Sequence, residues 1–476
     1  MMLESAAWSR QAPPMQPVLL LDVVGLTARQ ITAATPSLQS LRARGEGAPM
    51  SAVLPAVTCS AQATMLTGRL PREHGCVGNG WFFRDLGEAW LWRQSNRLVH
   101  GEKLYERARA LDPSFTCAKL FWWWNLGAAV DFSITPRPFY PADGRKLLAV
   151  YGTPDAFRAE VEAELGPFPF FDFWGPKAGL ASSRWIADAT LHTLRTRRPT
   201  LTMAYLPHLD YDHQRYGPRD ARSLQALVDV DRIVGELIQG ADEVGAEVVV
   251  VSEYGIEDAP RPVHINRALR AAGLLAVRPT PVGETLDVFA SRAFAVADHQ
   301  VAHVYAEEAA RPAVKAVLRE LDGVGEILDA AGKERQGLDH PNAGDLVAVA
   351  QPGAWFTYYY WLDDGAAPDF ARTVDIHRKP GYDPCELFID PALRAPKVRV
   401  ARRLLQKKLG LRYLMDVIPL DASLVKGSHG RLPAEPLDGP VFLASCKLER
   451  CGGVPADGVV AMTSVAERVL ALLQRA

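Results

Sequence analysis

The stretch PVLLLDVVGL, residues 17–26, is an unbroken apolar run that carries a single acid, Asp22. This composition is typical of a central parallel strand that is buried on both faces of its sheet. A carboxylate placed in such a strand costs free energy unless it is paired or hydrogen-bonded. Asp22 is therefore the first candidate for a functional residue.

Comparable apolar runs recur along the chain and alternate with helical patterns such as residues 221–241 and 463–476. These runs span residues 201–210, 246–255 and 438–445. Strands that alternate with helices predict a doubly wound, mostly parallel α/β sheet with helices on both faces. Ligands of such sheets collect at the carboxyl ends of the strands. The polar residues at or just past those ends are Asp22, Asp210, Glu253 and His429.

The length of 476 residues predicts more than one structural unit. Residues 263–388 differ from the rest in their pattern of expected elements, because a helical pattern is followed there by short β-like pieces. We interpret this segment as a cap or insertion over the sheet edge. The catalytic core then comprises residues 17–262 and 389–476, and residues 1–16 form an N-terminal tail.

Composition excludes several classes of protein. The 53 Lys and Arg and the 55 Asp and Glu give a formal charge of 53 − 55 = −2, which argues against a nucleic-acid polymer or an anionic membrane as partner. No apolar run approaches the roughly 20 residues that span a bilayer, so no membrane insertion is expected. The N-terminal residues lack the pattern of a secretory signal, and the six cysteines lack metal-site spacing. These features predict a cytoplasmic protein with reduced thiols.

The segment PAVTCSAQATMLTGRLPREHGCVGNGWF, residues 55–82, carries the clearest local signal. Thr58 precedes a run of small, helix-compatible residues, so we expect its hydroxyl at a helix N-terminus. Unpaired N–H groups at such an end favour an anion. Thr58 is thus either a helix N-cap or part of a phosphate site.

Taken together, the motifs resemble the alkaline phosphatase superfamily, in particular its type I phosphodiesterase and nucleotide pyrophosphatase branch. The resemblance rests on Asp22 in LLLDVVGL, Thr58 and Asn79 in the 55–82 block, Asp210 in HLDYDHQRYGP, SEYG at 252–255 and GSHG at 427–430. It implies an alkaline-phosphatase-like fold and a metal-dependent hydrolase of phosphoric esters. Thr58 would be the nucleophile, while Asn79 and the backbone N–H after Thr58 would stabilise an oxygen of the phosphoryl group.

The resemblance also implies two divalent metal ions. The first would be held by Asp22, Thr58, Glu253 and Tyr254, and the second by Asp210, Gln214 and His429. Glu253, Tyr254 and Gln214 depart from the Asp, His and His of the family pattern. Zinc is expected from the family, but the loss of imidazoles favours manganese or magnesium.

Several neighbouring residues remain alternatives to this ligand set. His213, next to Asp212, replaces Gln214 if the loop shifts by one residue, although the downstream YGP favours Gln214. His377 competes with His429, or binds substrate phosphate together with Lys379. His208 either supports a ligand or is an ordinary buried histidine.

Two aromatic clusters, FWWWN at 121–125 and FTYYYW at 356–361, either line a substrate pocket or pack in the interior. The sequence as a whole predicts a phosphodiesterase or nucleotide pyrophosphatase that acts on a small cytoplasmic phosphate ester. The alternatives are a phosphomonoesterase in a biosynthetic pathway and a catalytically altered binding or scaffold protein. The oligomeric state is not set by these motifs.

Overall fold

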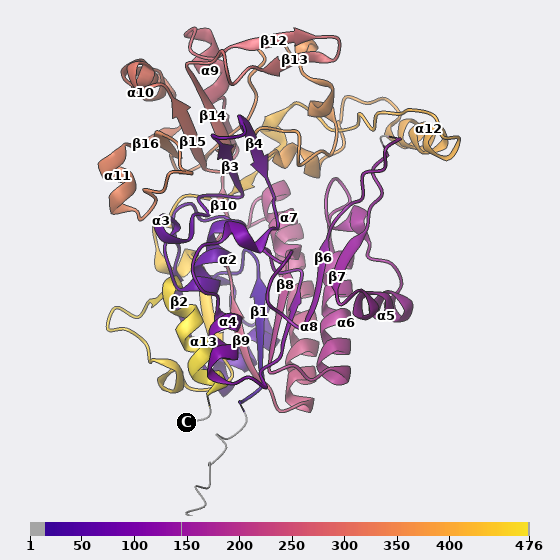
Figure 1. Ribbon diagram of the computed structural model, residues 1–476, viewed down its shortest axis with the longest axis vertical. Coiled ribbons are helices and arrows are strands. Elements are labelled where there is room, and N and C mark those ends of the chain that lie inside the picture. The colour runs from indigo at the N-terminus through magenta and orange to yellow at the C-terminus, as the bar shows by residue number, and fades with distance from the viewer. Residues whose placement is uncertain (1–14, 144, 475–476) are drawn as a thin grey trace, which may run out of the picture.

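The structure, a computed structural model, describes residues 15–143 and 145–474. Its largest element is a nine-stranded sheet in the order β21-β2-β20-β9-β1-β8-β5-β6-β7 (Figure 1). The strands are β1 (Val18–Val23), β2 (Glu46–Ser51), β5 (Cys117–Leu120), β6 (Phe132–Pro136), β7 (Val150–Thr153), β8 (Leu201–Leu206), β9 (Glu247–Val251), β20 (Val441–Ala444) and β21 (Val460–Ala461).

Strand β1 lies at the centre, with β8 and β9 parallel to it on either side. All six of its residues are buried, as the apolar run 17–26 predicts. Antiparallel pairing occurs only towards the margins of this sheet, at β7 and at β20. The predicted mostly parallel α/β sheet is therefore confirmed.

Helices cover both faces of the sheet (Figure 1). Leu19 and Leu21 of β1 pack with α1, α5, α6 and α8, whereas Val18 and Leu20 belong to the core formed with α2, α4 and α13. This alternation follows from the two-residue period of a strand. The helices on these two faces are α1 (Pro36–Arg44), α2 (Thr58–Thr67), α4 (Leu104–Leu111), α5 (Asp155–Leu165), α6 (Leu180–Thr196), α8 (Ala221–Glu243) and α13 (Val465–Leu473).

A second, smaller sheet lies over the carboxyl-end side of the large one (Figure 1). It is antiparallel, in the order β14-β15-β17-β16, and falls within the segment predicted as an insertion. Its elements and neighbours are β14 (Ala293–Asp298), β15 (Val301–Ala306), β16 (Val324–Leu328), β17 (Leu346–Ala350), α9 (Ile265–Ala271), α10 (Arg311–Glu320) and α11 (Ala330–Arg335).

Short elements connect these two layers. Four two-stranded pairs are β3 (Gly80–Phe83) with β4 (Glu88–Leu91), β10 (Glu257–Asp258) with β19 (Gly427–Ser428), β11 (Arg261–Val263) with β18 (Ala354–Phe356), and β12 (Val277–Thr280) with β13 (Gly283–Leu286). The remaining helices are α3 (Pro71–His74), α7 (His208–Tyr216) and α12 (Pro396–Lys408). Most of the predicted N-terminal tail, residues 1–14, lies outside the described residues. None of the described helices combines the length and the apolar character that a bilayer crossing requires.

Candidate active site

Thr58 is the first residue of α2, where its hydroxyl points towards the end of β9. The hydroxyl donates to Glu253 Oε2 over 2.7 Å and lies 3.3 Å from the Tyr254 hydroxyl. The N-cap of α2 is Val57, and no side chain caps the helix. Thr58 is therefore not an N-cap residue. Its hydroxyl is hydrogen-bonded to a carboxylate, which is the arrangement of a nucleophile beside a base.

Gln62 lies one helical turn after Thr58 and faces the same way. Its amide nitrogen donates to Glu253 Oε1 over 2.6 Å and to Asp22 Oδ2 over 3.1 Å. Its amide oxygen accepts the Trp123 backbone N–H over 2.6 Å. The side chain is thus fixed at both ends and stands between two buried carboxylates. We did not predict Gln62 as a site residue, although its four-residue spacing from Thr58 is visible in the sequence.

The carboxyl groups of Asp22 and Glu253 share a buried environment. Burial raises the pKa of Asp22, and the neighbouring Glu253 carboxylate raises it further. Burial also raises the pKa of Glu253, although its hydrogen bonds with Asp22, Thr58 and Gln62 act in the opposite direction. A base whose pKa lies closer to neutrality is a more effective proton acceptor near pH 7.

A second group of polar side chains surrounds Asp210, in the first turn of α7. Asp210 Oδ2 accepts from the Gln214 amide over 2.7 Å, and Asp210 Oδ1 accepts from the Tyr254 hydroxyl over 3.3 Å. Gln214 in turn accepts from the Tyr382 hydroxyl over 3.1 Å. Burial, followed by the charge of Glu253, raises the pKa of Asp210 to about 7.

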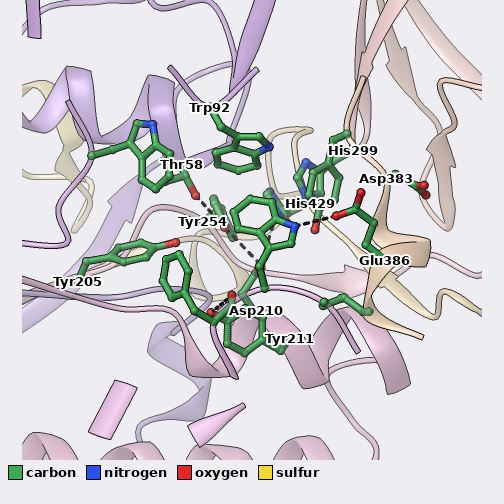
Figure 2. Close-up of a pocket in the computed structure, with 16 residues that line it drawn as sticks. Thr58, Trp92, Tyr205, Asp210, Tyr211, Tyr254, His299, Asp383, Glu386 and His429 are labelled. Atoms are coloured by element: carbon green, nitrogen blue, oxygen red, sulfur yellow. Dashed lines mark hydrogen bonds and ion pairs between the residues drawn. The ribbon is translucent and has the colours of Figure 1, made fainter. Parts of the chain in front are cut away.

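Four rings stack beside this group. The Tyr254 ring lies 3.6 Å from the His429 ring at an interplanar angle of 7°. His429 lies 3.7 Å from His299, and His299 lies 3.9 Å from Tyr382. In Figure 2, Thr58, Tyr254 and His429 approach one another above Asp210. The stack joins residues that lie far apart in the sequence.

His299 is a pocket residue that the sequence did not reveal. The stretch VADHQVAHVYA alternates like one continuous strand, but the chain turns at His299 between β14 and β15. His299 adopts a positive φ of 58° at this turn. His303 instead remains in β15, where it bonds to the Val77 carbonyl.

Asn79 is close to Thr58, and its side chain forms two hydrogen bonds. Its amide oxygen accepts the Cys59 backbone N–H over 3.0 Å, and its amide nitrogen donates to Asp298 Oδ1 over 3.0 Å. The two donors predicted to stabilise the phosphoryl oxygen are Asn79 and the N–H after Thr58. The Cys59 N–H is bonded to Asn79, whereas the second N–H of the Asn79 amide has no described partner, so the predicted role of Asn79 stays a prediction.

The predicted two-metal site does not fit these side chains. Within residues 15–143 and 145–474, no three His, Cys, Asp or Glu side chains are grouped so that they could hold a metal. The amide nitrogen of Gln62, a donor, stands between the two carboxylates predicted to bind the first metal. Gln214 likewise turns its amide nitrogen towards Asp210. Asp22 Oδ1 and His429 Nε2 have no hydrogen-bond partner among the described atoms, and His429 Nε2 lies 3.6 Å from Asp210 Oδ1.

The alternative ligands lie elsewhere. Gln214, not His213, faces Asp210, and both ring nitrogens of His213 are buried without a described partner. Asp212 pairs with Arg215 over 2.9 Å. His208 is buried at the start of α7.

The predicted phosphate ligands are also corrected. Lys379 is 1% exposed and forms ion pairs of 2.7 Å with both Asp383 and Glu386, so its ammonium group is not available to a substrate. His429, not His377, lines the pocket.

Thr58 opens into a small pocket with a cavity volume of about 40 Å³. Half of its lining is aromatic. These residues are Trp92, Trp123, Phe173, Trp174, Tyr205, Tyr211, Tyr254 and Tyr382. Trp123 comes from the predicted cluster 121–125, whereas cluster 356–361 is buried away from the pocket.

Comparison with known families identifies the chain. The sequence model of the type I phosphodiesterase / nucleotide pyrophosphatase family matches residues 18–383. The chain belongs to this family. Among curated proteins, a Schizosaccharomyces pombe protein named as an uncharacterized pyrophosphatase/phosphodiesterase is 26% identical over 241 residues. That match covers 47% of this chain and 41% of the yeast protein, so the chain spans about two fifths of its curated relative.

Two solved structures share the fold of this chain. Phosphonoacetate hydrolase from Sinorhizobium meliloti 1021 has a TM-score of 0.61 at 16% identity, with 98% of each chain covered. Murine ectonucleotide pyrophosphatase / phosphodiesterase 5 has a TM-score of 0.57 at 15% identity, with 97% of this chain and 96% of that one covered. At these identities the comparison establishes the alkaline-phosphatase-like fold.

Proposed function

We propose that the chain hydrolyses a phosphoric ester with Thr58 as nucleophile and Glu253 as general base. The observation that carries this proposal is the 2.7 Å hydrogen bond from the Thr58 hydroxyl to Glu253 Oε2. A hydroxyl is a weak nucleophile until a positioned base accepts its proton. Family membership supports phosphorus as the centre that is attacked.

In the first step the Thr58 oxygen bonds to phosphorus, its proton passes to Glu253, and the bond from phosphorus to the leaving oxygen breaks. The leaving oxygen takes the proton from Glu253. Water then attacks the phosphothreonine and gives its proton to Glu253, which returns it to the departing Thr58 oxygen. The products are the free alcohol and, from a phosphodiester, a phosphomonoester, and no step passes through a metal ion.

The charges around Thr58 favour a phosphodiester over a phosphomonoester. A monoester approaches two negative charges at neutral pH, because its second pKa is about 6, whereas a diester carries one. The pocket lining includes Asp210, Asp383 and Glu386 but no Lys or Arg among its sixteen described residues. Repulsion therefore disfavours the more highly charged ester.

The test is turnover of bis-p-nitrophenyl phosphate and p-nitrophenyl phosphate without added metal, combined with the intact mass of the protein during turnover. We expect faster hydrolysis of the diester and a covalent phosphoryl adduct on wild-type protein. Thr58→Ala should lose both signals, Thr58→Ser should keep part of the rate, and Glu253→Gln should lose at least 100-fold, the lower range for a general base. Undiminished hydrolysis by a folded Thr58→Ala variant contradicts the nucleophile assignment.

A binding or scaffold protein is the second candidate, and one observation favours it. The Cys59 N–H bonds to the Asn79 amide oxygen, and one Asn79 amide N–H bonds to Asp298, so only one N–H of the predicted donor pair is left for a phosphoryl oxygen. This candidate predicts that wild-type protein gives no adduct and no turnover with either ester. Divalent metal ions added singly should not change that result.

A further inference from the structure

The segment of residues 391–415 is strongly basic. It contains eight Lys and Arg and no Asp or Glu, so the near-zero net charge of the whole chain does not describe it. Helix α12 forms the middle of this segment. None of the residues of α12 is buried, and the helix stands out from the body of the molecule (Figure 1). Most of its surface is therefore open to a partner.

The inner side of α12 is held against the rest of the chain. Arg399 and Arg403 both form ion pairs with Asp416, the latter over 3.0 Å. Val400 packs against the hydrophobic core. The spacings of one, three and four residues put these three side chains on one side of the helix. The rotation of α12 about its own axis is thus fixed, and its opposite side is held outward.

The outer side of α12 carries an apolar stripe. Val398, Leu405 and Leu409 are 68%, 57% and 65% exposed. Their spacings of seven and four residues place them on one face. The chain that follows the helix adds three further exposed apolar side chains, Leu411, Tyr413 and Leu414. A contiguous exposed apolar surface of this kind marks a site of interaction with another protein or with a membrane.

Cations flank the stripe on both sides. The helical period of 3.6 residues places Lys397 and Lys408 on one side of it and Arg402 on the other. Within residues 15–143 and 145–474, six basic side chains of the segment form no ion pair: Arg394, Lys397, Arg402, Lys407, Lys408 and Arg412. Unpaired cations beside an apolar stripe indicate a partner that is both apolar and anionic.

A hollow beside the first turns of α12 offers a place for a compact anion. Its volume is about 540 Å³, and Val398 lines it, so it adjoins the apolar stripe. Four arginines also line it, namely Arg394, Arg399, Arg402 and Arg403. Asp416 is the one carboxylate that pairs with any of the four among the described residues, so positive charge is in excess there. Guanidinium groups bind phosphate through two parallel N–H bonds.

We propose that α12 lies in the plane of an anionic lipid surface and that the hollow receives a headgroup phosphate. Two attractions hold interfacial helices, which are burial of apolar side chains at the acyl boundary and charge attraction to the headgroups. The outer side of α12 supplies both. The inference does not depend on the proposed hydrolysis, because none of residues 391–415 lines the Thr58 pocket.

Other partners match only part of this surface. A second copy of the chain would bring its own eight cations against these eight, and charge repulsion disfavours that contact. A nucleic acid would use the cations but would leave Val398, Leu405 and Leu409 exposed to water. A protein with an acidic groove takes a helix into that groove, whereas the inner side of α12 is already held by Asp416 and by the core.

Vesicle sedimentation tests this inference with the full chain. We expect binding to vesicles of phosphatidylcholine with about 30% phosphatidylserine and weak binding to pure phosphatidylcholine. The combined change Lys397→Gln, Arg402→Gln and Lys408→Gln should lower the affinity for the anionic vesicles at least about tenfold, because each cation near the surface adds attraction. These three side chains are exposed and have no ion pair with a described residue, so the variant should fold like wild type.

A matched control removes the same charge from other parts of the surface. It changes three exposed arginines that also form no ion pair within the described ranges, by Arg97→Gln, Arg319→Gln and Arg335→Gln. This control should bind like wild type, whereas Leu405→Ser with Leu409→Ser should bind more weakly at unchanged charge. Equal sedimentation with both kinds of vesicle, or equal loss in the control, overturns the inference. RNA binding without vesicle binding also overturns it.

Phosphatidic acid tests the hollow, because its phosphomonoester is exposed at the surface. At matched surface charge, wild-type protein should prefer vesicles with phosphatidic acid to vesicles with phosphatidylserine. Arg394→Gln should remove this preference and keep most of the binding to phosphatidylserine, since one guanidinium of the hollow is lost. Wild-type protein without the preference overturns the headgroup site. Release of the protein by millimolar inorganic phosphate at constant ionic strength also overturns it, because a free phosphate would then be the ligand.

Discussion

At the scale of single residues, Gln62 determines what the site can hold. The sequence identified Asp22, Thr58 and Glu253, and all three meet in the structure. It did not reveal that a glutamine amide would stand between the two carboxylates. That position depends on the helical turn from Thr58 and on the Trp123 N–H that orients the amide, neither of which a motif records.

Replacing Gln62 by Ala should destabilise the protein and create affinity for a cation. The change leaves Asp22 Oδ2 and Glu253 Oε1 without their amide donor in a buried place, at a cost of about 2–4 kcal/mol. We expect manganese to raise the melting temperature of this variant but not that of wild type. Gln94→Ala, which removes a buried glutamine bonded to Pro136, should show no manganese effect. Equal manganese responses in all three proteins would contradict this reading of Gln62.

At the scale of elements, strands were predictable and turns were not. The apolar runs located β1, β8, β9 and β20, because double-sided burial demands continuous apolar sequence. The β14–β15 hairpin was missed because His299 and Gln300 interrupt neither the alternation nor the β-like composition. As a result the sequence pattern alone does not place His299 in the pocket.

Strand β5 supports a pH prediction. Lys119 is fully buried there, with its ammonium bonded to the Trp124 carbonyl, and burial lowers its pKa to about 7. Between pH 7 and about 10 the unfolded chain keeps a proton on Lys119 that the folded protein has released. The free energy of unfolding therefore rises with pH over this range. Lys119→Met should remove that rise, on the order of a few kcal/mol.

The measurement is urea unfolding at pH 7 and pH 9.5. The wild-type free energy of unfolding should increase relative to Lys119→Met as pH rises, whereas the exposed-site control Lys426→Met should follow wild type. A constant difference between wild type and Lys119→Met at the two pH values would show that burial does not depress this pKa.

At the scale of the whole molecule, the pocket is shared by the large sheet and the smaller one. Asn79 lies 219 residues before Asp298, yet the Asp298 carboxylate accepts both its backbone N–H and its side-chain amide. The same carboxylate bonds to His299. No local pattern predicts a contact of this separation, so the sequence suggested an insertion over the sheet edge without showing what joins it to the core.

Asp298→Ala should therefore weaken the contact between the large sheet and the smaller sheet. It leaves three buried donors without an acceptor, and we expect a loss of about 3 kcal/mol or more in the free energy of unfolding. Asp322→Ala, which removes an exposed partner of Arg261, should cost less than about 1 kcal/mol. Similar losses in both variants would argue against a junction at Asp298.

The account depends most on the claim that the Gln62 amide occupies the place between Asp22 and Glu253 that a metal ion would need. Elemental analysis of the purified wild-type protein tests this claim directly, together with its melting temperature before and after chelation. We predict no stoichiometric transition metal or magnesium and an unchanged melting temperature. One or two tightly bound metal ions per chain, with a melting temperature that falls on chelation, would contradict it.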